Sequence, residues 1–298
     1  MRGVWRVRKL RDGLLGRARL ARAKLRVATF PSIRRTRQHD LPCELIVSLT
    51  SYPARFSSLA RTLRSLLDQS VTADRTILWI AENDYEEIPE QVRVLEQFGL
   101  EIRRCPDLRS YKKLIPALGE YPGAIIVTAD DDIYYQPDWL SDLVNEAKRH
   151  PGIIIACRAH MARFQSDGSL MPYSTWQFDT ESADSSLAER IFPTGSGGVL
   201  YPPGALDCRV SDSDTFMRLC PSADDIWFFW MAALAGTASR RAERHRPLVE
   251  WDGTQEVALF HDNWLAGGND TQIRAMESHF GKILPHGVTD RKPSSRVA

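Results

Sequence analysis

Two rhythms of apolar residues alternate between residues 43 and 157. Short, continuous apolar runs are followed by segments in which apolar side chains recur every three or four positions. The runs are typical of strands buried on both faces, and the longer period is typical of helices with one apolar face. The helix after the first strand, for example, has apolar residues at Phe56, Leu59, Leu63 and Leu66. The predicted strands cover residues 44–50, 76–81, 101–105, 124–129 and 152–157.

This strand–helix alternation predicts an α/β domain with a mostly parallel sheet and helices on both faces. Right-handed crossovers then give a Rossmann-like topology, in which ligands bind beyond the carboxyl ends of the strands. No GxGxxG motif follows the first strand, which disfavours a dinucleotide cofactor. Polar segments that follow the strands are expected to line one edge of the sheet, namely 51–55, 82–84, 112–113 and 130–132.

Three consecutive aspartates, Asp130, Asp131 and Asp132, end the fourth apolar run. Adjacent carboxylates repel one another, and burying any of them unpaired costs several kcal/mol. A divalent cation removes this cost, because Mg²⁺ and Mn²⁺ take carboxylate oxygens and commonly bridge to phosphates. The alternative is a solvated acidic turn. The position at the end of a buried strand favours a cation-and-diphosphate site.

The pattern weakens beyond residue 158. Residues 158–192 are rich in serine, aspartate and aromatics and are predicted to be irregular. A glycine-rich turn at 195–198 leads into a strand at 199–201; it serves either close approach to a ligand or a tight turn. A buried helix is predicted at 226–235, preceded by two acids that complement its dipole or carry chemistry. Residues 246–251 are predicted as a last strand.

Charge is distributed unevenly along the chain. Residues 1–37 hold 13 Lys or Arg and one acid, although the whole chain has a formal charge of +1. Apolar residues recur there at helical spacing, with basic residues on the other face: Val4, Val7, Leu14, Ala18, Ala21 and Leu25. This pattern predicts a basic amphipathic helix on an anionic membrane surface, where each Lys or Arg contributes about 1 kcal/mol. A disordered basic tail and an organelle transit peptide are the alternatives.

Composition excludes several other classes. The acidic remainder of the chain has no second basic patch, which argues against nucleic-acid binding. The hydrophobic share of 43% is ordinary for a soluble protein, and no apolar run approaches the length of a membrane span. Five scattered cysteines without CxxC spacing argue against a zinc site and a disulfide framework, and favour a reducing compartment.

Five segments together resemble a known family, the bacterial GT-A-fold glycosyltransferases of the family 2-like kind found in capsule and lipopolysaccharide gene clusters. They occur in the family's order: VSLTSYPARF (47–56), SYKKLIPAL (110–118), IIVTADDDIYY (125–135), GSGGVLYPP (195–203) and CPSADDIWFFWMA (220–232). The resemblance implies a GT-A domain over 40–285, preceded by the basic segment 1–37 and followed by a frayed tail at 286–298. It also implies transfer of a sugar from a nucleotide-diphosphate sugar to a glycan or polyprenyl-linked acceptor. Such an enzyme is expected at the cytoplasmic face of the membrane.

On the donor side, the resemblance makes Asp130 and Asp132 the outer positions of a DxD motif. Asp132 is then expected to bind Mn²⁺ or Mg²⁺ directly, and Asp130 to support the ribose or the metal's waters. The remaining residues expected around the nucleotide sugar are Thr50, Tyr52 and Arg55 at the base and ribose, Glu82 and Asp84 after the second strand, Lys112 or Lys113 at the diphosphate, and Asp131. For the two lysines, a solvated helix face is the alternative.

On the acceptor side, the resemblance places a general base at Asp225, with Asp224 as the second choice. A neighbouring acid raises the pKa of such a base toward the useful range. Gly197 and Gly198 are expected to floor the acceptor site, and Trp227 is expected either to stack on a sugar or to fill the core. His261 is expected as a further metal ligand or as a surface histidine. Inversion at the anomeric carbon is the expected outcome.

Two other functions compete with sugar transfer. A nucleotidyltransferase acting on a sugar phosphate uses the same sheet edge and metal, but it usually carries a glycine-rich phosphate loop after its first strand, and this chain has none. A non-catalytic carbohydrate-binding or scaffold protein has no need for two acidic clusters. Both considerations favour a glycosyltransferase.

Overall fold

The computed structural model describes residues 2–32, 36–181, 189–244, 246–253 and 268–283. Its centre is a sheet with the strand order β3-β2-β1-β4-β8-β5-β9. The strands are β1 (Leu45–Thr50), β2 (Arg75–Ala81), β3 (Leu100–Cys105), β4 (Ile125–Ala129), β5 (Ile154–Ala156), β8 (Val199–Tyr201) and β9 (Ser239–Arg241). Neighbours pair in parallel except β8, which is antiparallel to both β4 and β5. The predicted mostly parallel α/β sheet is confirmed.

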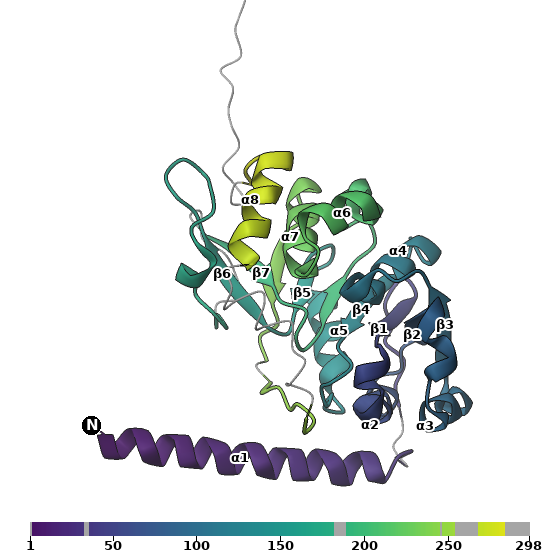
Figure 1. Cartoon of the computed structure of the whole chain (residues 1–298). Coiled ribbons are helices and arrows are strands. Elements are labelled where there is room, and N and C mark those ends of the chain that lie inside the picture. The colour runs from purple at the N-terminus through teal and green to yellow at the C-terminus, as the bar shows by residue number, and fades with distance from the viewer. Residues whose placement is uncertain (1, 33–35, 182–188, 245, 254–267, 284–298) are drawn as a thin grey trace, which may run out of the picture.

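The strands are apolar throughout because both faces of the sheet are covered. Alternate residues of β1 enter different cores: Ile46 packs on one side, and Leu45 and Val47 pack on the other. Helices α2 (Phe56–Leu67), α3 (Glu90–Arg93) and α5 (Trp139–Arg149) cover the second side. Helices α4 (Ile115–Glu120), α6 (Ser213–Leu219), α7 (Asp224–Leu234) and α8 (Gly268–Phe280) cover the first (Figure 1).

Two expectations about the second half of the chain are wrong. Residues 158–192 are not wholly irregular, because β6 (Ala159–Arg163) and β7 (Glu189–Pro193) form an antiparallel pair. Phe192 of β7 anchors this pair, its ring centroid lying 5.0 Å from that of Phe229 in α7. Residues 246–251 form no strand; only an isolated bridge joins Glu250 to Ile133.

Helix α1 (Arg2–Ala28) passes one side of the domain, and its C-terminal part lies near α2 (Figure 1). Ala23 and Val27 are buried against Val249 and Trp251. The described members of the predicted apolar stripe lie on another face, because Ala18, Ala21 and Leu25 are all exposed. The domain is therefore held by a different face of the helix from the one that the apolar pattern picks out. Within the described part of the chain, no helix combines the length and hydropathy of a membrane span.

Candidate active site

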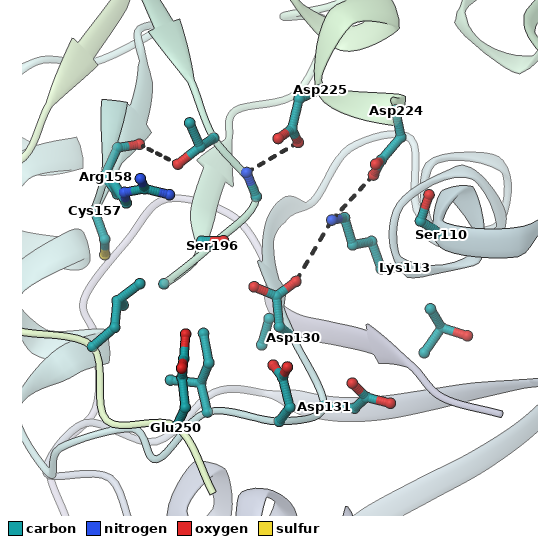
Figure 2. A pocket seen from close by; sticks show the side chains of 18 of the residues that line it. Ser110, Lys113, Asp130, Asp131, Cys157, Arg158, Ser196, Asp224, Asp225 and Glu250 are labelled. Carbon is teal, nitrogen blue, oxygen red and sulfur yellow. Dashed lines mark hydrogen bonds and ion pairs between the residues drawn. The ribbon is translucent and has the colours of Figure 1, made fainter. Parts of the chain in front are cut away.

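A cavity of about 1580 Å³ opens at the carboxyl edge of the main sheet. Its wall comes from the ends of β1, β4 and β5 and from the amino end of α7. Because β8 runs antiparallel, the glycine-rich turn that precedes it also lies at this edge. The two acidic clusters of the sequence, 130–132 and 224–225, therefore face the same cavity (Figure 2).

Arg55 neutralises two of the three aspartates. Its Nη1 lies 2.5 Å from Asp132 Oδ2 and 3.9 Å from Asp131 Oδ1. Burial lowers the pKa of Arg55, but these carboxylates outweigh it and hold that pKa above its ordinary value. Ser51 Oγ donates to Asp131 Oδ2 at 2.5 Å. Burial nevertheless raises the pKa of Asp131 to about 6, and the charge of the neighbouring Asp132 adds to this rise. The structure thus places Arg55 at the aspartates.

Lys113 connects the two acidic clusters. Its Nζ lies 3.0 Å from Asp224 Oδ2 and 3.6 Å from Asp130 Oδ1 (Figure 2). Burial lowers the pKa of Lys113, yet Asp224, Asp130 and Asp225 together keep it well above the ordinary value. Burial raises the pKa of Asp130 to about 7; Lys113 opposes that rise and Asp132 adds to it. Lys113 is therefore a permanent cation inside the cavity.

Asp225 is held by the glycine-rich turn. Gly195 N donates to Asp225 Oδ1 at 3.0 Å (Figure 2). Burial and the adjacent Asp224 raise the pKa of Asp225 to about 6, while Lys113 and the Gly195 N–H lower it. A carboxylate with a raised pKa is suited to accept a proton near neutral pH.

Gly195 has no room for a side chain. A Cβ at this position would lie 2.5 Å from Lys113 Nζ and 3.1 Å from Asp225 Oδ1. The first distance is shorter than any ordinary van der Waals contact, so the lysine would have to move. The absence of a side chain at Gly195 therefore allows Lys113 and Asp225 to approach the same turn.

Most of the residues expected at the nucleotide line the cavity, but not all of them do. Thr50, Tyr52 and Asp84 line the cavity, although Thr50 Oγ1 donates to Trp79 O at 2.8 Å within the sheet. Glu82 is exposed and stands outside the cavity wall. Lys112 lines the cavity, but its Nζ is held by Asp107 Oδ1 at 2.8 Å.

Of the residues expected at the acceptor, some line the cavity and others lie inside the domain. Gly197 lines the cavity, whereas a Cβ on Gly198 would lie 2.7 Å from the Trp139 ring, so Gly198 packs inside the domain. Trp227 is fully buried and its Nε1 donates to Val210 O at 3.0 Å. Stacking of Trp227 on a sugar is therefore wrong, and its role is in the core. His261 lies outside the described residues.

Several cavity residues were missed by the sequence reasoning. Arg158 directly follows the predicted strand 152–157, so the rule that found the aspartates would also have found it. Glu250 was missed because it lies inside the predicted strand 246–251 and not after its end, whereas the structure makes this segment a loop. Burial and Asp132 raise the pKa of Glu250, which shows how close the loop comes to the aspartates. Aromatic residues of the β6–β7 region also line the cavity, namely His160, Tyr173, Phe178 and Phe192.

The carboxylates of the cavity are suitable donors for a divalent cation. No three His, Cys, Asp or Glu side chains of the described residues form an all-protein metal cage. A Mg²⁺-type site needs only one or two carboxylates when substrate phosphates and water complete it. At the centre of the cavity, Arg55 and Lys113 pair with four carboxyl groups, those of Asp130, Asp131, Asp132 and Asp224. A fifth, Asp225, is close enough to Lys113 to raise its pKa. This surplus of negative charge and the hard oxygen donors fit a divalent cation that binds together with a diphosphate.

Comparison with known proteins identifies the class. The family model described as "Glycosyl transferase family 2" matches residues 49–200, which include β1, β4 and the aspartates. This match spans more than half of the chain, and the protein belongs to glycosyl transferase family 2. Its fold is GT-A-like, as the sequence resemblance implied. No curated protein matches the chain.

Solved structures resemble it only distantly. Staphylococcus aureus TarS 1–349 is 14% identical with a TM-score of 0.43, and its complex with UDP is 14% identical with a TM-score of 0.47. In both cases the match covers 68% of this chain and 59% of the TarS 1–349 chain. A mycobacterial protein is 18% identical over 40% of this chain and 41% of that chain, with a TM-score of 0.31.

Proposed function

We propose that the protein transfers a sugar from a nucleotide-diphosphate sugar to a glycan or polyprenyl-linked acceptor in surface-polysaccharide synthesis. One observation carries this proposal: two acidic clusters from distant parts of the sequence face one cavity and share Lys113. One cluster has the composition of a diphosphate-and-cation site, and the other has a carboxylate suited to deprotonate a hydroxyl. Family membership supports the assignment.

In this proposal the donor nucleotide lies over the ends of β1 and β2, where Thr50, Tyr52 and Asp84 line the cavity. Asp130 and Asp132 would hold Mn²⁺ or Mg²⁺, which supplies positive charge for the diphosphate leaving group. Arg55 pairs with Asp132 in this structure. When a cation takes up that carboxylate, the guanidinium would be released to pair with the diphosphate.

Asp225 is the proposed general base. It accepts the proton of the acceptor hydroxyl, whose oxygen forms the new bond to the anomeric carbon while the bond to the nucleotide diphosphate breaks. Attack from the face opposite to the leaving group inverts the anomeric centre. Lys113 stabilises the ionised form of Asp225 and Gly195 N orients it. A nucleotidyltransferase is the weaker alternative, because it needs no base on α7.

A screen for thermal stabilisation by nucleotide sugars tests the donor assignment. UDP-, GDP-, CMP- and dTDP-sugars are each added with and without Mn²⁺, and a Mn²⁺-dependent rise of several degrees is expected for one of them. Asp132→Asn should abolish that rise and slow nucleotide release about a hundredfold or more. Asp214→Asn, on the exposed side of α6, is the matched control. No stabilisation by any donor would refute the proposed function, and an unchanged response of Asp132→Asn would refute the metal assignment.

We also propose that α1 holds the enzyme against an anionic membrane surface at the cytoplasmic face. Two ion pairs support the seating of this helix on the domain, Arg26 to Asp68 at 2.8 Å and Lys24 to Asp252 at 2.5 Å. Leu15 and Leu25 point away from the domain, 45% and 69% exposed. These two leucines and the exposed bases beside them, Arg17 and Arg22, are thus left available to lipid.

A further inference from the structure

The cavity extends beyond Asp225, away from the three aspartates, into a region walled by aromatic side chains. The Phe178 ring centroid lies 4.7 Å from that of His160 and 5.4 Å from that of Tyr173, in edge-to-face contacts. All three residues line the cavity, and Phe178 is 37% exposed. An exposed aromatic face held by two others is a rigid platform for the apolar face of a sugar ring.

Arg158 provides the positive charge of this region. Its Nε lies 4.0 Å from Asp179 Oδ1, too far for a hydrogen bond, and the described residues offer its guanidinium no closer polar contact. The side chain is 34% exposed and lines the cavity (Figure 2). The other described cations of the wall each have a polar contact of 3.5 Å or less, namely Arg55, Arg109, Lys112, Lys113, Arg244 and Arg246.

The neighbouring histidine does not share this charge. His160 Nδ1 accepts a hydrogen bond from Asp179 N at 3.0 Å. Burial and the nearby Arg158 lower the pKa of His160 to about 4, so the ring is neutral at physiological pH. Asp179 Oδ1 approaches Arg158 at Nε, and no hydrogen bond to another described residue holds the guanidinium. An arginine guanidinium in this position matches a carboxylate or a phosphate.

The position of Arg158 points to the acceptor and not to the donor. It follows β5, which the antiparallel strand β8 separates from β4 and its aspartates. In Figure 2, Arg158 and Lys113 lie on opposite sides of the glycine-rich turn, with Asp225 beside that turn. A group bound at Arg158 therefore lies beyond the proposed base from the diphosphate.

We infer that Arg158 and the Phe178–Tyr173–His160 platform form an acceptor subsite for a negatively charged sugar unit, either a uronic acid or a phosphorylated sugar. This inference rests on the proposed glycosyl transfer and adds the chemical class of its acceptor. The ring stacks on Phe178, and the anionic group pairs with the two Nη groups of Arg158. The hydroxyl that attacks the donor then faces Asp225.

Binding of three simple probes tests this inference. Methyl β-D-glucuronide, glucose 6-phosphate and methyl β-D-glucoside are titrated into the full chain, and binding is followed by saturation-transfer NMR. At least one anionic probe should bind about ten- to a hundredfold more tightly than the neutral glucoside, as for a charged hydrogen-bonded pair. Comparing glucuronide with glucose 6-phosphate shows whether the subsite binds a carboxylate or a phosphate more tightly.

Variants separate charge recognition from stacking. Arg158→Gln should abolish the preference for the anionic probe, and Arg158→Lys should retain part of it. Arg163→Gln, on the same strand pair but outside the cavity wall, should leave the preference unchanged. Phe178→Ala, an exposed position at which folding is spared, should weaken all three probes by about two- to tenfold.

The donor response of the same samples separates the two hypotheses. Equal binding of charged and neutral probes, a preference that survives Arg158→Gln, or no binding of either anionic probe would overturn the subsite. If the wild-type protein still shows Mn²⁺-dependent stabilisation by a nucleotide sugar in that case, only the acceptor inference fails. If Arg158→Gln weakens nucleotide-sugar stabilisation as much as anionic-probe binding, Arg158 belongs to the donor site and the inference is also overturned.

Discussion

Lys113 determines the electrostatics of the cavity at the scale of single residues. It lies between Asp130 and Asp224, so one ammonium group interacts electrostatically with both acidic clusters. Its own charge is secure, because the carboxylates outweigh the effect of burial on its pKa. Asp225 accepts a hydrogen bond from the Gly195 N–H and has a pKa raised to about 6, so it can take up a proton near neutral pH.

Asp225→Asn should abolish transfer and stabilise the fold. The pKa of Asp225 is raised from 3.8 to about 6, so ionisation above that pH opposes folding. The favourable contribution of this group is full below its unfolded pKa and is lost as the pH rises through about 6. The variant should therefore be more stable than the wild type at pH 7–8, on the order of 1–3 kcal/mol, with little difference near pH 4.

Thermal unfolding across this pH range measures the stability difference, and a transfer assay measures the activity. Wild-type kcat/KM should rise with pH through about 6, the raised pKa of Asp225. The variant should lose about a hundredfold or more in transfer while keeping donor-induced stabilisation. Full transfer activity in Asp225→Asn would remove it as the base.

Gly195→Ala tests the packing of the turn. The added methyl group meets Lys113 Nζ and Asp225 Oδ1, so the ion pair of Lys113 with Asp224 should be displaced. We expect a stability loss of about 1–3 kcal/mol and at least a tenfold loss of transfer. Gly119→Ala, where a Cβ meets nothing within 4 Å, is the matched control and should be neutral. Denaturant unfolding and the transfer assay report both effects, and wild-type behaviour of Gly195→Ala would contradict the steric argument.

At the scale of elements, α1 uses one face to pack on the domain and leaves another face exposed. Its small buried residues, Ala23 and Val27, pack on the loop of Val249 and Trp251. The same loop presents Glu250 and Leu248 to the cavity. The helix therefore supports one wall of the active site through its buried face, while its outer face stays free.

Removing two exposed charges from α1 should weaken membrane binding. Arg17 and Arg22 are exposed, and Arg17→Gln with Arg22→Gln should lower binding to phosphatidylglycerol-containing vesicles about thirtyfold at low salt. The matched control removes Arg218 and Arg274, which are exposed on α6 and α8. Vesicle co-sedimentation measures both. Equal loss in the two double variants would argue against α1 as the membrane-binding element.

At the scale of the whole molecule, one edge of the sheet gathers residues that are far apart in the chain. Ser51 and Asp131 are joined by a hydrogen bond across 80 positions, and Lys113 reaches Asp224 from the other side. Parallel strands make this possible, because they all deliver their carboxyl ends to one edge. The single antiparallel strand, β8, adds its preceding turn to the same edge.

The sequence by itself determined the α/β class, six of the seven main strands and the edge on which the chemistry lies. These features follow from local periodicity, which a buried strand or an amphipathic helix must obey whatever its partners. The same reasoning found both acidic clusters and the glycine-rich turn. It also identified the basic helix, whose apolar pattern is a local property.

Only the tertiary structure decided how these parts meet. The pairing of Arg55 with Asp132, the bridge made by Lys113 and the exclusion of a side chain at Gly195 depend on distances between segments that no local pattern encodes. The burial of Trp227 and the seating of α1 on its less apolar face were settled by packing, because the residues that cover a surface come from elsewhere in the chain. Glu250 lines the cavity for the same reason, because packing makes the predicted strand 246–251 a loop.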